Sequence, residues 1–263
     1  MVVAEEEGVS ILLAENVSKS FGGLKAVQNF RLSLPKGSLQ GLIGPNGAGK
    51  TTVFNLLTGV YRADTGTVTL DGTTLNGLRP SRIAAAGMAR TFQNIRLFGE
   101  LSVLDNVKIA CHLRARTGLP GTLLRTPTHV GEERAIEERS RELLSIFSLA
   151  DREHDQARSL PYGDQRRLEI ARALATGPKV LLLDEPAAGM NPQEKKSLRE
   201  LIRLVREKFG LTVLLIEHDM GVVMDICERI TVLDYGQIIA EGTAKEVQNN
   251  PKVIEAYLGT EVH

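Results

Sequence analysis

The spacing of apolar and polar positions predicts β-structure at the start of the chain. Residues 11–36 mix short β-branched runs with turn residues, and residues 66–75 (GTVTLDGTTL) read as a strand interrupted by the turn pair Asp71-Gly72. Strands joined by short turns pair with their neighbours in opposite directions. We therefore expect the front part of the chain to be antiparallel.

A different pattern lies between and after these segments. Residues 38–43 form an apolar strand, residues 44–50 a glycine-rich loop, and residues 51–57 the start of a helix. Further along, residues 113–131 combine several glycines and prolines with polar positions, which predicts a long loop or insertion. A helix over residues 132–147 is expected to follow it.

The second half of the chain alternates strands with helices. Residues 180–183 read as a buried strand, and Asn191-Pro192 supply an N-cap followed by proline at the first helical position. Apolar residues then recur at helical spacing up to Gly210, where the helix should end. The other predicted elements are a strand over 211–216, a helix through Val222 and Met224, and a hairpin over 229–241 that turns at Tyr235-Gly236. This alternation predicts a parallel sheet covered on both faces.

One further helix start carries a chemical expectation. Residues 158–174 (RSLPYGDQRRLEIARAL) predict a proline-led helix with Gly163 near its beginning and no metal ligands or nucleophile–base pair. Helix N-termini attract anions, and a glycine lets the backbone approach a ligand closely. We expect an anion at the start of this helix.

Composition narrows the class of protein. The 263 residues carry 32 basic and 32 acidic side chains, so no overall positive field favours nucleic acid or anionic lipid. The first ten residues carry acids where a signal peptide carries Lys or Arg, and the apolar runs are short, which predicts a soluble intracellular protein. Cys111 and Cys227 stand alone, so we expect reduced, structural thiols.

The strongest chemical signal is the segment GPNGAGKTT, which fits the P-loop pattern. Backbone N–H groups of such a loop wrap a triphosphate, the lysine adds charge at the outer phosphates, and the first threonine is placed to ligate Mg²⁺. A glycine-rich turn without a ligand is the alternative, but the expected strand before it and helix after it favour the P-loop. The predicted nucleotide-binding residues here are Gly44, Pro45, Asn46, Gly47, Ala48, Gly49, Lys50, Thr51 and Thr52.

The segment VLLLDEP supplies a partner for this loop. Asp184 ends an apolar strand and can hold the shell of a Mg²⁺ ion, while Glu185 can polarise an attacking water. By itself the segment could be a solvated strand end with two acids. Together with a P-loop it predicts nucleotide hydrolysis.

In these motifs the chain resembles the ATP-binding cassette (ABC) ATPases. GPNGAGKTT, TFQNIRLF, LPYGDQRR, LLLDEP, AAGMNP and LLIEHD occur in the order and approximate spacing of that family across nearly the whole chain. LxYGxQRRLEIAR, DEPAAGxNP, HDM and the GLPGTLLRTP insertion are similar to the larger ATPase subunit of branched-chain amino acid importers.

This resemblance implies an α/β fold. Its parts are a P-loop NTPase core with a mostly parallel sheet, an N-terminal antiparallel β subdomain and an inserted helical subdomain. A single ABC ATPase domain would span residues 1–263. The core would take approximately residues 1–92 and 176–263, and the helical subdomain residues 93–175.

The resemblance also assigns roles outside the P-loop. Phe21 matches the aromatic residue that stacks on adenine, although a core phenylalanine is its alternative reading. Gln93 matches the residue that reaches Mg²⁺ and the attacking water, and His218 the γ-phosphate sensor. Glu185, His218, Gln93 and Lys50 are the implied catalytic residues, and Thr51, Gln93 and Asp184 the implied ligands of Mg²⁺. Asn191 takes the place of the usual aspartate, and its N-cap role suffices to explain it.

Gly163 would contact the ATP held by a partner, because ABC cassettes work as head-to-tail pairs. The signature departs from LSGGQ, with Pro161 for the serine, Tyr162 for a glycine and Asp164 for the glutamine. Pro161 has neither a hydroxyl nor a backbone N–H, and Asp164 would repel phosphate unless it points away. The hypothesis is that this helix seals its ATP site less well, which leaves the two sites of a dimer unequal.

The implied function is the ATP-hydrolysing subunit of an importer for branched-chain or related amino acids, using ATP and Mg²⁺. Its partners would be transmembrane permease subunits, a second ABC ATPase and, indirectly, a solute-binding protein, with no nucleic acid. It would lie peripherally at the cytoplasmic face of the cell (inner) membrane. The permease would dock near residues 93–107, and the apolar residues offered there are Leu97, Phe98, Leu101, Val103 and Leu104.

Other functions stay open at this point. An ATPase of lipopolysaccharide export has a similar cassette, and a soluble ABC ATPase acting on nucleic acid or ribosomes would typically carry paired cassettes, a coiled coil or basic extensions. A degenerate cassette that binds ATP without hydrolysis is opposed by Lys50, Glu185 and His218. The solute, and the choice between a homodimer and a heterodimer, are not encoded in these motifs.

Overall fold

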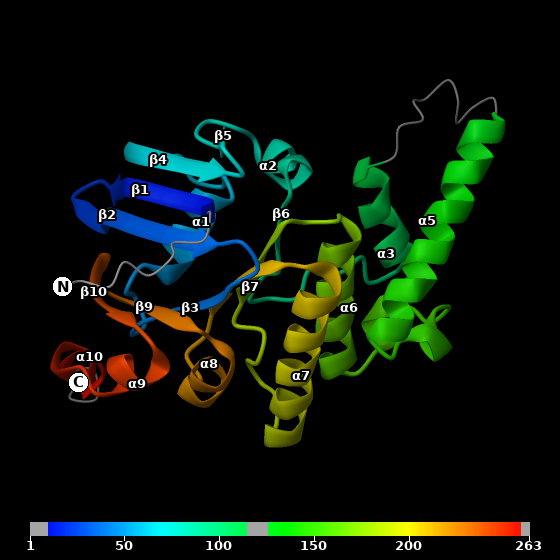
Figure 1. Cartoon of the computed structure of the whole chain (residues 1–263). Coiled ribbons are helices and arrows are strands. Elements are labelled where there is room, and N and C mark those ends of the chain that lie inside the picture. The colour runs from blue at the N-terminus through cyan, green and yellow to red at the C-terminus, as the bar shows by residue number, and fades with distance from the viewer. Residues whose placement is uncertain (1–9, 115–125, 259–263) are drawn as a thin grey trace. The chain divides into compact units, whose positions relative to one another are not determined.

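The computed structural model describes residues 10–114 and 126–258 (Figure 1). The described residues form two compact units. The first takes the chain up to Arg90 and again from Lys179 onward, and the second is Thr91–Pro178.

An antiparallel sheet opens the first unit, as the front part of the sequence predicts. Its strand order is β2-β1-β4-β5, and Leu12 of the second strand pairs with both Leu34 and Leu70. Asp71 and Gly72 both have positive φ, which fits the tight turn predicted there. The strands are β1 (Ser10–Phe21), β2 (Leu24–Pro35), β4 (Thr65–Leu70) and β5 (Thr73–Thr74).

A six-stranded sheet forms the rest of the β-structure, in the order β10-β9-β3-β8-β7-β6. All neighbours are parallel except β9 and β10, which form the predicted hairpin. Every residue of β3, β7 and β8 is buried, and these strands are mostly apolar. The strands are β3 (Leu39–Ile43), β6 (Met88–Arg90), β7 (Val180–Asp184), β8 (Thr212–Ile216), β9 (Arg229–Asp234) and β10 (Gln237–Gly242).

Helix α7 of the first unit begins and ends at the caps that the sequence predicts. The Asn191 side chain accepts the Glu194 N–H, a capping box is complete, and Gly210 ends the helix at φ 59°. The predicted helix over this segment is therefore confirmed. Two C-terminal helices have no counterpart in the sequence prediction. The helices are α1 (Lys50–Leu57), α2 (Pro80–Ala86), α7 (Pro192–Phe209), α8 (Met220–Ile226), α9 (Ala244–Gln248) and α10 (Pro251–Leu258).

The core of the first unit fixes the helix that follows the glycine-rich loop. Phe54 and Leu57 of α1 are fully buried. They belong to one cluster with Leu12 of the antiparallel sheet and Leu214 of the parallel sheet. Helix α1 therefore packs between the two sheets, which confirms the α/β class with its antiparallel subdomain.

The second unit is helical. Its α5 helix begins at Pro127, five residues before the predicted start, because Thr126 caps it by accepting the His129 N–H and proline occupies the first helical position. The expected loop over 113–131 is therefore shorter at its C-terminal end, and its residues 115–125 lie outside the described part. The elements are α3 (Val103–Cys111), α5 (Pro127–Ile146), α6 (Tyr162–Ala175) and 3₁₀ turns at His112–Arg114, Ala150–Arg152 and Ala157–Ser159.

Two remaining expectations concern the cysteines and the membrane. Cys111 and Cys227 are both buried and free, as expected. Burial raises the pKa of the Cys227 thiol to about 12, so it stays protonated at neutral pH. Within the described ranges, none of the helices combines the length and the apolar character needed to cross a membrane.

Candidate functional site

Three neighbouring strands bring the predicted site residues of the first unit other than Phe21 to one edge. The strand order places β8 between β3 and β7, and all three run parallel. Their carboxyl ends therefore meet. The glycine-rich loop follows β3, Asp184 ends β7, and His218 lies two residues past the end of β8. In open α/β sheets, ligands bind at such an edge.

The glycine-rich loop is packed on two sides and open at its tip. A Cβ on Gly44 would lie 2.1 Å from the Leu233 carbonyl oxygen, and one on Gly49 would lie 2.6 Å from that of Ala26. At Gly47, with φ +82°, a Cβ would meet no atom within 4 Å. Side chains are thus excluded where the loop touches the fold, while its tip leaves space for a ligand.

Lys50 lies folded back onto this loop. Its Nζ donates to the carbonyl oxygens of Gly44 at 2.6 Å and Pro45 at 2.9 Å, and the residue is only 7% exposed. Burial lowers the pKa of Lys50, and the nearby Glu185 and Asp184 oppose that shift. The ammonium group is therefore held at the loop with its stem withdrawn from water.

Helix α1 presents an open N-terminus directly after the loop. Gly49 is its N-cap in the left-handed region, no side chain caps it, and its first turn holds no acidic residue. The first N–H groups of a helix lack intrahelical acceptors and carry partial positive charge. Thr51 is exposed and Thr52 half-buried in that first turn. The arrangement suits a phosphate group.

Asp184 lies beside a residue that the sequence interpretation missed. The Arg90 Nη2 donates to Asp184 Oδ2 at 2.7 Å, and both side chains are less than 8% exposed. Arg90 also donates to Asn55 Oδ1 at 2.6 Å and lies over the Phe54 ring. The sequence feature that could have identified Arg90 is a charged residue inside a short strand, because a buried arginine needs an acidic partner.

Glu185 and His218 face each other across neighbouring loops. Glu185 Oε2 lies 3.7 Å from His218 Nδ1, and the Glu185 N–H donates to the Ile216 carbonyl at 2.9 Å. Glu185 has φ +46°, a left-handed conformation that is uncommon for non-glycine residues and gathers at functional sites. The His218 side chain is 58% exposed. This pair combines a carboxylate and an imidazole next to open space.

Phe21 is not a core residue. It is 43% exposed, and its ring meets the Tyr61 ring edge-on with 5.1 Å between the centroids. The Lys19 ammonium lies 5.5 Å from the Phe21 ring centre. This removes the core alternative and leaves an aromatic face at the surface.

Gln93 and Gly163 belong to the second unit. Gln93 is exposed, and its carbonyl oxygen accepts from Arg166 Nη2 at 2.8 Å. The fully buried Arg166 also pairs with Glu169 at 2.9 Å, which ties the segment after Thr91 to α6. The sequence interpretation missed this pair, although its spacing of three helical residues signals it.

Gly163 is half-buried in the first turn of α6, with Pro161 as N-cap and no capping side chain. Asp164 in the same turn lies 3.7 Å from Arg152 and 3.6 Å from Arg167. Two guanidinium groups thus balance its charge, which reduces the repulsion expected of an acid at an anion site.

The apolar surface expected near residues 93–107 is only partly present. Phe98 and Leu101 are exposed, and the Arg172 guanidinium lies 5.5 Å from the Phe98 ring centre. Val103 and Leu104 are buried in α3 and belong to the core, so they are not part of an exposed docking surface.

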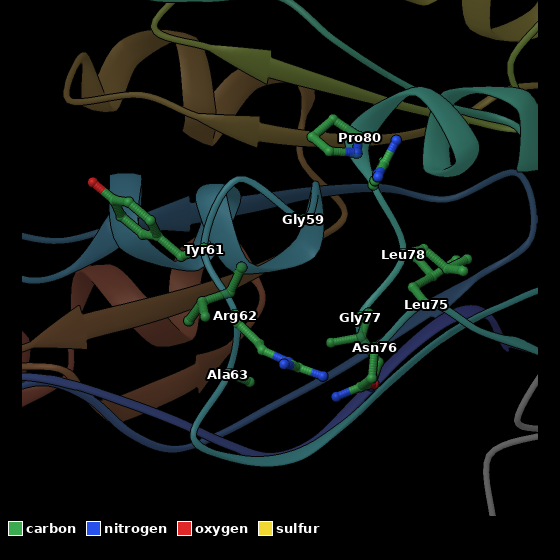
Figure 2. Close-up of a pocket in the computed structure, with 12 residues that line it drawn as sticks. Gly59, Tyr61, Arg62, Ala63, Leu75, Asn76, Gly77, Leu78 and Pro80 are labelled. Atoms are coloured by element: carbon green, nitrogen blue, oxygen red, sulfur yellow. The ribbon is translucent and has the colours of Figure 1, made fainter.

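A separate cavity of about 290 Å³ lies in the first unit (Figure 2). Its wall combines apolar side chains such as Leu75 and Leu78 with the cationic Arg62, which points toward the loop of Asn76 and Gly77. Tyr61, the neighbour of Phe21, also lines it. None of its lining residues is an acid, a histidine or a cysteine, so it lacks the groups of a hydrolytic site.

Family models and relatives agree with this geometry. Residues 27–188 match the model "ABC transporter", and residues 237–263 match "Branched-chain amino acid ATP-binding cassette transporter". The high-affinity branched-chain amino acid transport ATP-binding protein LivG of Salmonella typhimurium is 49% identical over 249 residues, which cover 95% of this chain and 98% of LivG. The lipopolysaccharide export system ATP-binding protein LptB of Haemophilus influenzae is 36% identical, with the same coverage.

Solved structures of ABC transporter cassettes have the same fold as this chain. An ATP-binding cassette of an ABC transporter in its ADP conformation superposes with a TM-score of 0.82 at 33% identity, covering 95% of this chain and 99% of that one. A dimeric cassette in a post-hydrolysis state, bound to ADP and Pi, gives a TM-score of 0.75 at 25% identity, with 89% and 98% covered.

Proposed function

This chain belongs to the ABC transporter family, and we propose that it is the ATP-hydrolysing subunit of an importer for branched-chain or related amino acids. The observation that carries the chemistry is the placement of Lys50, Asp184, Glu185 and His218 at one sheet edge. The observation that carries the solute class is the 49% identity to LivG over 95% of this chain.

ATP would bind along the glycine-rich loop. The open tip at Gly47 and the uncapped N-terminus of α1 provide backbone N–H donors for the phosphates. Lys50 would exchange its two carbonyl acceptors for phosphate oxygens. Phe21 offers its exposed ring to the adenine.

Hydrolysis needs a positioned water and stabilised negative charge. Glu185 would accept a proton from the attacking water, and the His218 imidazole would donate to the γ-phosphate. Lys50 would neutralise charge that develops on the phosphoryl oxygens. The short distance between Glu185 and His218 supports their action on one phosphate.

The residues present also fit a magnesium ion, which is usually held by one or two protein oxygen ligands together with phosphates. Thr51 and Asp184 would supply oxygen ligands from the first unit, and the family resemblance implies Gln93 as a further ligand. Bound there, Mg²⁺ would screen charge on the β- and γ-phosphates. The Arg90 guanidinium, 2.7 Å from Asp184 Oδ2, holds the Asp184 carboxylate in place at the end of β7.

The proposed partners are transmembrane permease subunits and a second cassette, with a solute-binding protein delivering the solute. Such a complex would place this chain peripherally at the cytoplasmic face of the membrane. Phe98 and Leu101 offer exposed apolar contacts to a permease. The uncapped start of α6 at Gly163 would face ATP on the partner cassette.

Lipopolysaccharide export is less well supported, because the identity to LptB is 36% against 49% to LivG. Uptake of labelled leucine by cells whose own copy carries Lys50→Ala tests the choice. Loss of uptake with unchanged surface lipopolysaccharide supports the importer. Unchanged uptake with lost lipopolysaccharide contradicts it.

A further inference from the structure

Glu217 is a fully buried carboxylate for which the mechanism above has no role. Its Oε1 accepts the Ala187 N–H at 2.7 Å. Its Oε2 accepts the His218 N–H at 3.2 Å and lies 3.5 Å from the Asp219 nitrogen. One side chain therefore bonds to backbone on two different loops.

These two loops carry the proposed catalytic pair. Ala187 follows Glu185 by two residues after β7, and His218 follows β8. The strands are in register up to the pair Asp184 and Ile216, and the Glu185 N–H adds one more bond to Ile216. Beyond that point both segments leave the sheet, and the Glu217 carboxylate bridges them.

A carboxylate group fits the backbone donors at this position. It offers two acceptor oxygens and no donor, whereas a glutamine offers one acceptor and an NH₂ group. In Glu217→Gln the amide nitrogen would face a backbone N–H on one of the two loops, so one side of the bridge would be lost. Burial raises the pKa of Glu217, and the backbone donors oppose that shift.

The bridge lies next to the reacting groups. Glu217 Oε2 is 3.9 Å from His218 Nδ1, and Glu185 Oε2 is 3.7 Å from the same nitrogen. We propose that Glu217 is a positioning residue that ties the backbone after Glu185 to the backbone of His218 and thereby sets the separation of their side chains. This inference rests on the proposed ATPase function.

The test compares Glu217→Gln with Glu228→Gln in the full chain. Glu228 is the control, because it also accepts a backbone N–H, from Leu39 at 3.2 Å, and pairs with Arg206 at an exposed position away from the site. A misplacement of about 1 Å can cost roughly 100-fold in rate, so Glu217→Gln should lower kcat for ATP by about 10- to 100-fold. KM should stay within about two-fold, because the phosphate loop is untouched. The control should keep both constants.

Amide hydrogen exchange supplies a readout that does not depend on turnover. In wild type the amides of Ala187, His218 and Asp219 should exchange slowly, like those of β7 and β8. In Glu217→Gln at least one loop should exchange faster by about 10-fold or more, while the α1 amides keep their protection.

Two results overturn the proposal. One is a Glu217→Gln protein with wild-type kcat, even if its Tm has fallen, since that outcome marks a purely structural role. The other is fast exchange of these amides in wild type, which is measurable even if the variant does not fold. If wild type itself failed to hydrolyse ATP, the proposed function would fail, and exchange would still report on the bridge.

Discussion

The Arg90 guanidinium lies 2.7 Å from the Asp184 carboxylate, and both side chains are withdrawn from water. Arg90 stands on β6 and Asp184 on β7, so the pair spans two neighbouring parallel strands. Through Asn55 and Phe54, Arg90 also contacts the helix that follows the phosphate loop. The pair thus joins the proposed metal-binding carboxylate to α1, the helix proposed to bind the phosphates.

Arg90→Met should destabilise the protein strongly. The methionine fills the space but removes the guanidinium that pairs with the buried Asp184 charge, and breaking such a pair typically costs about 3–5 kcal/mol. Urea unfolding measures the loss. Arg203→Met is the control, because Arg203 pairs with Asp225 at a half-exposed site and its removal should cost within about 1 kcal/mol. An equal loss of unfolding free energy in the two variants would show that the Arg90–Asp184 pair stabilises the fold no more than an exposed ion pair does.

Phe21→Trp should create a reporter of adenine binding. The chain has no tryptophan, and position 21 is 43% exposed, so the new indole can stack on a base without disturbing the core. ATP should quench its fluorescence, and Phe21→Ala should weaken ATP binding by about 1 kcal/mol or roughly five-fold. Fluorescence unchanged by saturating ATP would remove Phe21 from the site.

Asp219→Asn should change how stability depends on pH. The hydrogen bond from Lys195, then burial, affect the pKa of Asp219, and the net shift is downward. Because the pKa of Asp219 is lower in the folded protein than in the unfolded chain, where it is about 4, the ionised carboxylate stabilises the fold at pH values above about 4. This stabilisation is lost as the pH falls through the pKa of the folded protein. Asparagine keeps an oxygen to cap the Val222 N–H of α8 but loses the charge.

Wild type and Asp219→Asn should therefore differ most in unfolding free energy near neutral pH, and the difference should shrink as the pH falls below about 4. Lys195→Met should show the same behaviour because it removes the partner. A difference that stays constant from pH 7 to pH 3 would refute the linkage.

Pro161→Ser should raise ATP hydrolysis by the assembled complex if the altered signature weakens one site. Serine restores a hydroxyl and a backbone N–H at the N-cap of α6, where no side chain now caps the helix. Pro161→Ala restores only the N–H and separates the two effects. Hydrolysis that is unchanged in both variants would count against unequal sites.

The parts of the fold that the sequence predicted depend on local patterns. The phosphate loop and the strand before Asp184 lie in contiguous motifs, and the α7 caps at Asn191 and Gly210 lie next to the residues they serve. These features need only neighbours along the chain. The early start of α5 was missed because Gly131 and Pro127 were interpreted as loop residues, although proline at the first helical position favours a helix.

The site residues that the sequence patterns did not predict interact with partners that are distant along the chain. Arg90 meets Asp184 94 positions later, and Glu217 meets Ala187 30 positions earlier. No local sequence pattern identifies such partners, because they come together only when the parallel strands align in the sheet. Arg166 and Glu169 are close in sequence, but their task of holding the backbone of Phe92 is likewise tertiary.

The most direct test of the central claim uses Glu185→Gln, which should lose about 100- to 10,000-fold in turnover while still binding ATP. A tagged Glu185→Gln form is purified with MgATP from detergent-solubilised membranes, and the proteins that accompany it are identified by mass spectrometry. Recovery of two multispanning proteins and a second cassette of similar size is the result that the importer account predicts. Recovery of ribosomal or DNA-associated proteins, or of no membrane protein, would contradict it.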